Sequence, residues 1–243
     1  MKKLLSLILV LALCAGLGAP ALAAEEAPSF SDVKEGHYAY SAITWCASRG
    51  VLYGYGDGTF LPDDPVTRAG FCAMLARVFF PETLAAYEAE MEVDRPWYWP
   101  SLMALARNGI LAGTWWSSED SWWSADDSWH RTEDVWWRAG DSGNFRVGEY
   151  ITRYEMALLL YNIMARNYES VSLSEREAVQ QWIPDWDEVP ERYAVSVSGV
   201  YAAGIITGRA DRSFGGAGRM TRAQGCVVIH RLVEYLGVPV ARV

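Results

Sequence analysis

The chain has 243 residues and a formal net charge of −9 at pH 7, with 30 acidic against 21 basic residues. Nucleic acid is therefore not expected as a partner, because binding phosphates needs a basic face. The three histidines, His37, His130 and His230, are scattered, and no Cys/His spacing is that of a metal site. We predict no metal and no cofactor.

Residues 1–23 have the pattern of a secretory signal peptide. Lys2 and Lys3 precede an apolar stretch from Leu4 to Leu17, and residues 21–23 read Ala-Leu-Ala, a small-residue cleavage signal. We expect the exported chain to begin at about Ala24, with no membrane span after the signal is removed. The remainder is long enough for one compact domain or for three small units that share one core.

One short pattern occurs three times in the remaining chain. In each copy two glycines stand four positions apart, and a Phe precedes a Thr-Arg pair by seven positions. The copies are Gly50, Gly54, Phe60 and Thr67-Arg68; Gly109, Gly113, Phe145 and Thr152-Arg153; and Gly204, Gly208, Phe214 and Thr221-Arg222. Such repetition indicates that one supersecondary unit is used three times and that any site it forms can recur.

Each unit has the same predicted order of elements. It opens with an Asp and an aromatic cluster, continues as an amphipathic helix that ends at the first glycine, and turns through a Gly/Asp segment. A second helix then starts at the Thr-Arg pair. The predicted units are 30–79, 92–164 and 183–233.

Helix-start signals mark the second helices and the segments between the units. Thr152 with Glu155, and Thr221 with Gln224, fit a capping box, whereas the first copy has Gly70 at the reciprocal position. Residues 81–91 are rich in Ala and Glu and predict a short helix. Ser174–Glu177 predicts another capping box.

The second unit carries an insertion at 115–138. Seven of the 12 tryptophans lie there, repeating with Asp at a period of seven. Ser and Asp are poor residues for a helix interior, so we expect a surface loop or a small β-hairpin. It is either a glycan- or partner-binding surface or a loop that packs on itself.

The exported part contains Cys46, Cys72 and Cys226, and this odd number argues against a full disulfide framework. Cys72 and Cys226 each follow the Thr-Arg arginine by four positions, where the second copy has Ala157. The position is therefore predicted to be small and buried.

Three arginines carry the main chemical signal. Arg68, Arg153 and Arg222 are each predicted at the first position of a helix, where a cation opposes the helix dipole at a cost of roughly 0.3–1 kcal/mol. Each therefore needs a partner. One interpretation is an anionic ligand held by the guanidinium and by free helix N–H groups. The other is an ion pair with an aspartate that opens a unit, the candidates being Asp32, Asp94 and Asp185.

Two further residue classes accompany the arginines. Tyr38, Trp97 and Tyr193 are candidate platforms for the apolar face of a sugar ring, or else core residues. The second glycines, Gly54, Gly113 and Gly208, either let a ligand approach the backbone or allow a turn with positive φ.

Taken in order, these elements resemble the S-layer homology domain family, and the first copy resembles it most. The resemblance implies a mainly α fold, with three helix-loop-helix repeats in a pseudo-threefold bundle. It also implies a secreted protein of the bacterial cell wall or surface layer that binds a secondary cell-wall polysaccharide non-covalently, often one that carries pyruvate ketals. In that family the Thr-Arg arginine and an opening Asp line grooves between units.

Two other functions remain open. The chain could be a structural or adaptor protein of the surface layer that recruits a protein partner through the insertion. A glycan-cleaving enzyme would need two carboxylates at a suitable separation, and Glu119, Asp120, Glu133 and Asp134 lie among tryptophans. Because this segment is repetitive and Ser-rich while catalysis needs rigid placement, we predict that the chain is not an enzyme.

Overall fold

The computed structural model describes residues 28–92, 95–112, 146–167 and 171–240. The predicted signal peptide, Asp94, Gly113 and the insertion at 115–138 lie outside these residues. The described part forms eight α-helices and one short 3-10 helix, with isolated bridges in place of strands, which confirms the predicted mainly α class. The helices are α2 (Tyr40–Ala47), α3 (Arg68–Phe79), α4 (Pro81–Ala89), α5 (Trp99–Arg107), α7 (Arg153–Arg166), α8 (Leu173–Gln180), η3 (Trp186–Glu188), α9 (Glu191–Ala202) and α10 (Arg222–Leu236).

The first helix of each predicted unit ends in the same way. Gly50, Gly109 and Gly204 all have positive φ, between 64° and 73°, just after α2, α5 and α9. The N–H of the next residue bonds back to a carbonyl five positions earlier, the Schellman arrangement that glycine favours because it has no Cβ. The bonds join Val51 to Cys46, Ile110 to Leu105 and Ile205 to Val200.

The second helices begin as predicted. Thr152 with Glu155 and Thr221 with Gln224 form complete capping boxes, and Thr67 accepts a bond from the Gly70 N–H without a reciprocal side chain. Helix α4 confirms the short helix expected in 81–91. The capping box expected at Ser174–Glu177 is wrong: the box that starts α8 is formed by Ser172 and Glu175, two residues earlier in the chain than the predicted start. Both serines precede a Glu by three positions, so the pattern alone did not distinguish them.

A closed ring of backbone hydrogen bonds joins the residues that precede the three N-cap threonines. The Val66 N–H donates to the Met220 carbonyl at 2.9 Å, the Met220 N–H to Ile151 at 3.1 Å, and the Ile151 N–H to Val66 at 3.0 Å. All three residues are buried. Because each bond joins residues far apart in the chain, the ring sets α3, α7 and α10 side by side with their N-terminal ends together.

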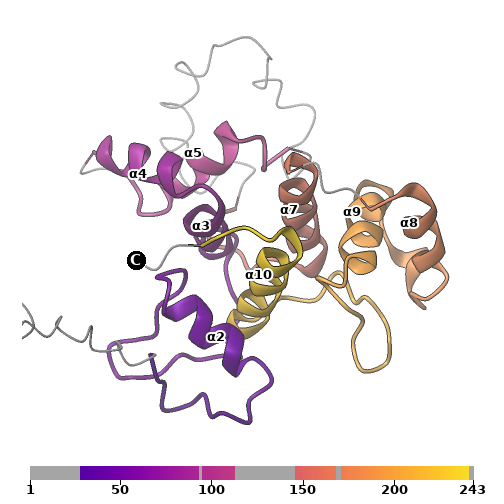
Figure 1. The fold of residues 1–243 in the computed structure, drawn as a ribbon, viewed down its shortest axis with the longest axis horizontal. Coiled ribbons are helices and arrows are strands. Elements are labelled where there is room, and N and C mark those ends of the chain that lie inside the picture. Colours follow the sequence, from indigo (N-terminus) through magenta and orange to yellow (C-terminus); the bar gives the residue numbers. More distant parts are fainter. Residues whose placement is uncertain (1–27, 93–94, 113–145, 168–170, 241–243) are drawn as a thin grey trace, which may run out of the picture.

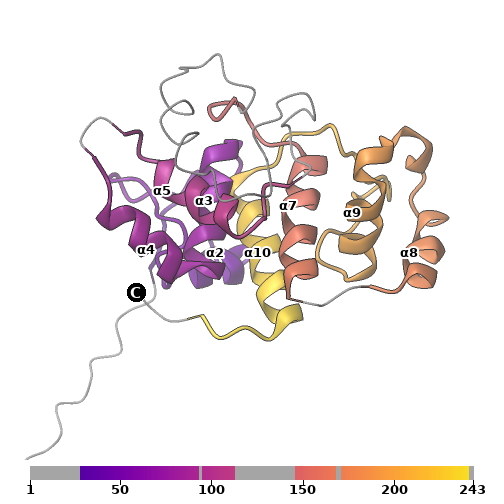
Figure 2. The same ribbon diagram turned by 90° about the horizontal axis from the view of Figure 1, so that it is seen from above.

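Packing of the helices follows a different division from the sequence repeat. Helix α3 packs against α5, α7 against α9, and α10 against α2. Thus the second helix of each predicted unit packs on the first helix of the next, and the last helix packs on the first. Figure 1 shows α3, α7 and α10 in the middle, with α2, α4/α5 and α8/α9 outside them, and Figure 2 shows α4/α5 and α8/α9 toward opposite ends. We call the three packed pairs the α3/α5, α7/α9 and α10/α2 lobes.

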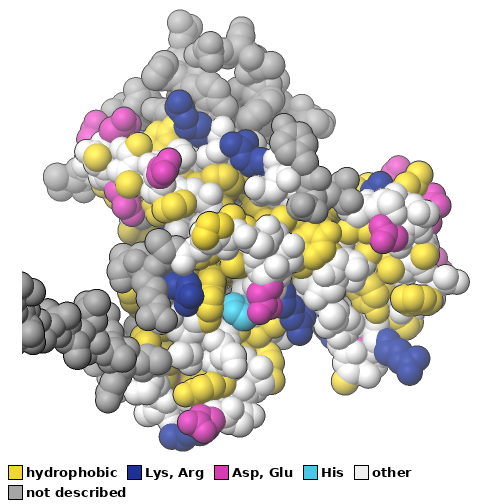
Figure 3. All heavy atoms as spheres, viewed as in Figure 1, with side chains coloured by type: hydrophobic (Ala, Val, Ile, Leu, Met, Phe, Trp, Pro, Cys, Tyr) yellow, Lys and Arg dark blue, Asp and Glu magenta, His cyan; other side chains and the backbone are white. Residues whose placement is uncertain are grey.

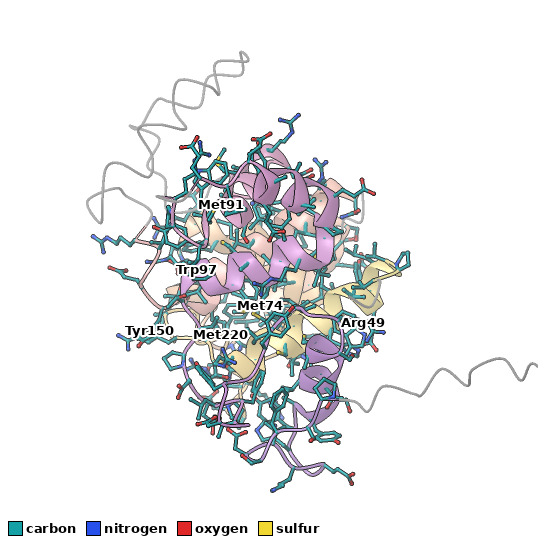
Figure 4. All side chains as sticks on the ribbon, turned by 90° about the vertical axis from the view of Figure 1, so that its left-hand side faces the viewer. Arg49, Met74, Met91, Trp97, Tyr150 and Met220 are labelled. Carbon is teal, nitrogen blue, oxygen red and sulfur yellow. The ribbon has the colours of Figure 1, made fainter. Side chains whose placement is uncertain are left out.

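The core lies between these helices and consists of Leu, Ile, Val, Met, Phe and Ala side chains. In Figure 4, Met74 and Met220 lie among the helices, whereas Trp97 and Tyr150 lie toward one side of the molecule. Cys72, Ala157 and Cys226 are fully buried, so the prediction of a small buried position four residues after each arginine is confirmed. Within the described ranges no single helix combines the length and hydropathy of a membrane span; α3 and α4 reach them only as a pair bent by 114°.

Candidate functional site

The N-terminal N–H groups of α3, α7 and α10 already have partners, contrary to the prediction that they are free for a ligand. The first two N–H groups of each helix donate to carbonyls in the loop of a neighbouring predicted unit. The pairs are Arg68 with Glu149, Arg153 with Gly218 and Arg222 with Asp64, each at 2.9 Å, and Ala69 with Val147, Tyr154 with Gly216 and Ala223 with Pro62. An anion at these places must therefore be recognised by side chains.

The arginine side chains lie at the three junctions between predicted units, but their surroundings differ. Arg68 is buried and makes ion pairs with Glu149 at 2.8 Å and Glu155 at 2.5 Å. Burial alone would lower the pKa of Arg68, but bonds to the two carboxylates raise it above its ordinary value. Arg68 is therefore neutralised within the chain. Its partners are glutamates of the next unit, and not the aspartate that we considered for an ion pair.

Arg153 is equally buried but has no carboxylate within 4.0 Å among the described residues. Its guanidinium bonds the Thr207 carbonyl, lies 3.7 Å from the Met220 sulfur, and faces the Phe214 ring at 5.1 Å. Its Nε is buried and has no hydrogen-bond partner within the described part of the chain. Burial, together with two neighbouring arginines, lowers the pKa of Arg153 to about 10. Those neighbours are Arg209 and Arg231.

Arg222 is half-buried and likewise has no acidic partner among the described side chains. Its Nε donates to the Phe60 carbonyl at 2.9 Å and one terminal nitrogen to the Tyr53 carbonyl at 2.8 Å. The guanidinium carbon lies 5.0 Å from the centre of the Tyr55 ring and 4.7 Å from that of Phe60. The exposed Tyr55 ring thus borders this cation, with Tyr38 close by on the same lobe, whereas the exposed Tyr53 ring faces Arg77 at 5.7 Å.

We call this group the Arg222 junction: Arg222 with Tyr38, Tyr53, Tyr55 and Phe60. Sequence reasoning did not select Tyr53 and Tyr55. Both flank Gly54 in the turn, and that was the only sequence signal for them, because their partner Arg222 lies more than 160 positions away. We call Arg153 with Thr207 and Phe214 the Arg153 junction.

The two opening aspartates among the described residues, Asp32 and Asp185, bond backbone N–H groups and make no ion pair with a described arginine. Both carboxylate oxygens of Asp32 accept bonds at 2.8 Å, from the N–H groups of Phe60 and Leu61. Asp185 accepts equivalent bonds from Phe214 and Gly215. Burial would raise the pKa of Asp32, but the backbone donors hold it below its ordinary value. These aspartates fix the turn on which the neighbouring arginine rests.

The three candidate sugar platforms differ in exposure. Tyr38 and Trp97 are 66% and 61% exposed. Tyr193 is buried and stacks on Tyr154 with ring centres 5.2 Å apart, so it is a core residue and not a platform. Tyr38 interacts with Thr221, the N-cap residue next to Arg222, which places it at the Arg222 junction. Trp97 packs edge-on against Tyr98 in another lobe.

Of the second glycines, Gly54 and Gly208 do not have positive φ; the first glycines of the pattern do. Both instead lie too close to their own turn to carry a side chain. A Cβ on Gly54 would stand 2.4 Å from Phe30 Cε1 and 2.7 Å from the Thr59 carbonyl oxygen, and one on Gly208 would stand 2.7 Å from the Arg212 carbonyl oxygen. At both glycines, the group that approaches the backbone closely is therefore another part of the same chain.

Gly54→Ala is therefore expected to lower the free energy of unfolding by about 1–3 kcal/mol, the usual range for forcing an extra carbon into a packed site. Urea unfolding of the exported protein measures it. Gly56→Ala is the matched control, because a Cβ there meets nothing within 4 Å. Equal midpoints for the two variants would contradict this role for Gly54.

Charges elsewhere on the surface are mixed. On the face shown in Figure 3, basic, acidic and apolar side chains are interspersed. Among the described residues no three His, Cys, Asp or Glu side chains gather as a metal site would require. Of the two buried arginines in the described part of the chain, Arg68 has carboxylate partners and Arg153 has none within 4.0 Å.

Comparison with known proteins gives sequence similarity to one family and to several cell-surface proteins and enzymes. The S-layer homology domain family matches residues 29–72 and 183–224. The chain is 26% identical to the exoglucanase XynX of Acetivibrio thermocellus over 220 residues, 89% of this chain and 17% of that protein. It is 29% identical to an S-layer protein of Bacillus thuringiensis subsp. finitimus over 114 residues, 46% of this chain and 14% of that protein. Cell surface glycoprotein 1 of Acetivibrio thermocellus is 42% identical over 52 residues, 21% of this chain and 2% of that protein.

These matches support a relationship between two segments of the chain, 29–72 and 183–224, and the S-layer homology domain family. The chain spans less than a fifth of the length of each of these relatives. The family and its cell-surface members indicate a secreted, cell-wall-associated protein whose S-layer homology domains serve in cell-surface anchoring.

Proposed function

We propose that the chain attaches to the bacterial cell wall by binding an acidic secondary polysaccharide, one that carries pyruvate ketals, at the Arg222 and Arg153 junctions. The observation that carries the proposal is Arg222, a half-buried cation with no acidic partner among the described side chains, bordered by the exposed Tyr55 ring.

The chemistry of the junction fits such a ligand. A guanidinium offers planar, forked donors that match a carboxylate, and bonds of this kind are stronger than neutral ones. Arg222 uses two of its donors on carbonyls, which orients the group and leaves further N–H groups for a ligand. A ketal carboxylate is attached rigidly to a sugar ring, whose apolar face can pack on tyrosine.

The three junctions are not equivalent in this proposal. At the Arg68 junction the guanidinium already pairs with two carboxylates, so its ion pairs hold two predicted units together. Arg153 is more buried than Arg222, and a ligand carboxylate reaching it would compensate a charge that no carboxylate among the described residues pairs. The Arg222 junction, with its exposed rings, is the principal site.

Removing the acidic groups from the polysaccharide tests the substrate class. Sedimentation with purified cell wall is expected to carry down the exported protein, and mild-acid depyruvylation is expected to weaken binding about 10-fold or more, because each lost charge-assisted bond contributes about 1.5–3 kcal/mol. Wall stripped of the polysaccharide is the control and should bind nothing. Unchanged affinity for the depyruvylated polymer would reject carboxylate recognition.

We assign the chain no catalytic role. The similarity to the exoglucanase covers 17% of that protein, so its activity does not extend to this chain through the match. The adaptor function, with a protein partner at the 115–138 insertion, concerns residues outside those described, and it stays a prediction.

A further inference from the structure

Two of the three buried cysteines meet where the last helix packs on the first. Cys46 lies on α2 and Cys226 on α10, and both are fully buried. The Cys46 sulfur stands 4.0 Å from the Cys226 carbonyl oxygen, and the two thiols also interact with each other. They are 180 positions apart in the chain, so only tertiary packing brings them together.

The repeat shows that this pairing is particular to one lobe. Cys46 accepts the Schellman bond that ends α2, and Leu105 and Val200 accept the same bond at the ends of α5 and α9. Cys226 follows its Thr-Arg arginine by four positions, as Cys72 and Ala157 do in α3 and α7. All six side chains are fully buried.

The equivalent pairs therefore read Cys72 with Leu105 in the α3/α5 lobe, Ala157 with Val200 in the α7/α9 lobe, and Cys226 with Cys46 in the α10/α2 lobe. Only the last pair consists of two cysteines. The first two lobes join helices that follow one another closely in the chain, whereas the α10/α2 lobe joins the helices that are farthest apart.

We propose that Cys46 and Cys226 form a disulfide that locks α2 onto α10 and closes the ring of lobes covalently. Cys72 stays a thiol, since its equivalent neighbour is Leu105. The inference does not depend on what the junctions bind.

The reaction balances with an external disulfide as oxidant. One cysteine thiolate attacks the oxidant, forms a mixed disulfide and releases one thiol; the second thiolate then attacks the mixed disulfide and releases the other. Cys46 and Cys226 together lose two protons and two electrons, and one oxidant disulfide becomes two thiols. Secreted proteins meet such oxidants, either disulfide-exchange proteins or small disulfides.

Burial and the adjoining Cys226 raise the pKa of Cys46 well above its ordinary value, which makes thiolate scarce in the folded protein. Exchange is therefore expected to be slow once α2 has docked. The bond forms while the α10/α2 lobe is still open, during folding after export.

Mapping the thiols of the exported protein tests this directly. Protein purified without reductant, denatured and alkylated is expected to show one reactive thiol, Cys72, and three after dithiothreitol. Digestion without reduction should yield a linked peptide that contains Cys46 and Cys226. Protein that is first reduced and then treated with oxidised glutathione should regain the disulfide. It should do so faster in moderate urea than in buffer.

Thermal unfolding adds a second readout. Reduction is expected to lower the Tm by about 10 °C, since cross-linking so long a loop constrains the unfolded chain strongly. Cys72→Ala, which copies Ala157, should keep both the link and the shift. Cys46→Val, which copies Val200, should lose both. The proposal would be overturned if the exported protein had three reactive thiols and still had three after glutathione treatment. A disulfide that includes Cys72 would also overturn it.

Discussion

Arg68→Ala is expected to lower the free energy of unfolding by about 3–5 kcal/mol, the cost of removing one partner of a buried ion pair. The reason lies in Glu155, whose side chain is 8% exposed and would remain as a buried carboxylate without its counter-ion. Glu155 also closes the capping box of α7 through the Thr152 N–H, so the change disturbs a helix start in the neighbouring unit. For a domain of this size the Tm should fall by about 10 °C.

Two control variants separate this effect from a general loss of charge. Glu149→Gln removes the half-exposed partner of Arg68 and should cost far less stability than Arg68→Ala, because exposed ion pairs contribute little. Arg107→Ala removes an exposed arginine at the end of α5 and should change little. Urea unfolding of the three variants measures the differences. If Arg68→Ala and Arg107→Ala have the same urea midpoint of unfolding, the ion pairs of Arg68 do not hold the two units together.

Arg222→Ala is expected to weaken binding to native cell wall by about 10- to 100-fold while costing little stability. The loss corresponds to charge-assisted hydrogen bonds from the guanidinium to a ligand carboxylate, about 1.5–3 kcal/mol in total. Stability should change little because Arg222 has no buried acid to leave unpaired among the described residues; it gives up bonds to two carbonyls, at Phe60 and Tyr53.

The measurement is a sedimentation isotherm on purified wall, with the Tm recorded for each variant. Arg222→Lys keeps the charge but loses the fork, so it should bind with an intermediate affinity. Arg107→Ala changes the net charge by the same amount away from the junction and should bind like the parent. Normal binding by Arg222→Ala would contradict the assignment of the Arg222 junction as the principal site. Unfolding of this variant would instead give Arg222 the same structural role as Arg68.

These two arginines also show how far sequence reasoning reaches. The repeat placed both at the start of a helix, and the structure agrees. It offered the same two interpretations for each, an anionic ligand or an aspartate partner. The different outcomes arise from Glu149 and Glu155, which belong to the second unit and lie more than 80 positions from Arg68. Nothing at the first unit's own positions reveals them.

Tyr193 and Asp32 illustrate the same limit. An aromatic residue after an opening Asp is compatible with a sugar platform or with core packing, and only the stacking partner Tyr154, on another helix, decides for the core. Asp32 can bond an arginine or a backbone N–H, and the folded turn brings the N–H groups of Phe60 and Leu61 to its carboxylate.

What the sequence determined by itself is local: the mainly α class, the threonine caps, the left-handed glycines that end α2, α5 and α9, and the small buried position shared by Cys72, Ala157 and Cys226. Each depends on residues within a few positions of one another, so spacing encodes it. The tertiary structure alone decided which helix packs on which, which arginine is neutralised, and that Cys46 meets Cys226. Those outcomes depend on contacts between distant segments, where one repeated pattern meets three different neighbours.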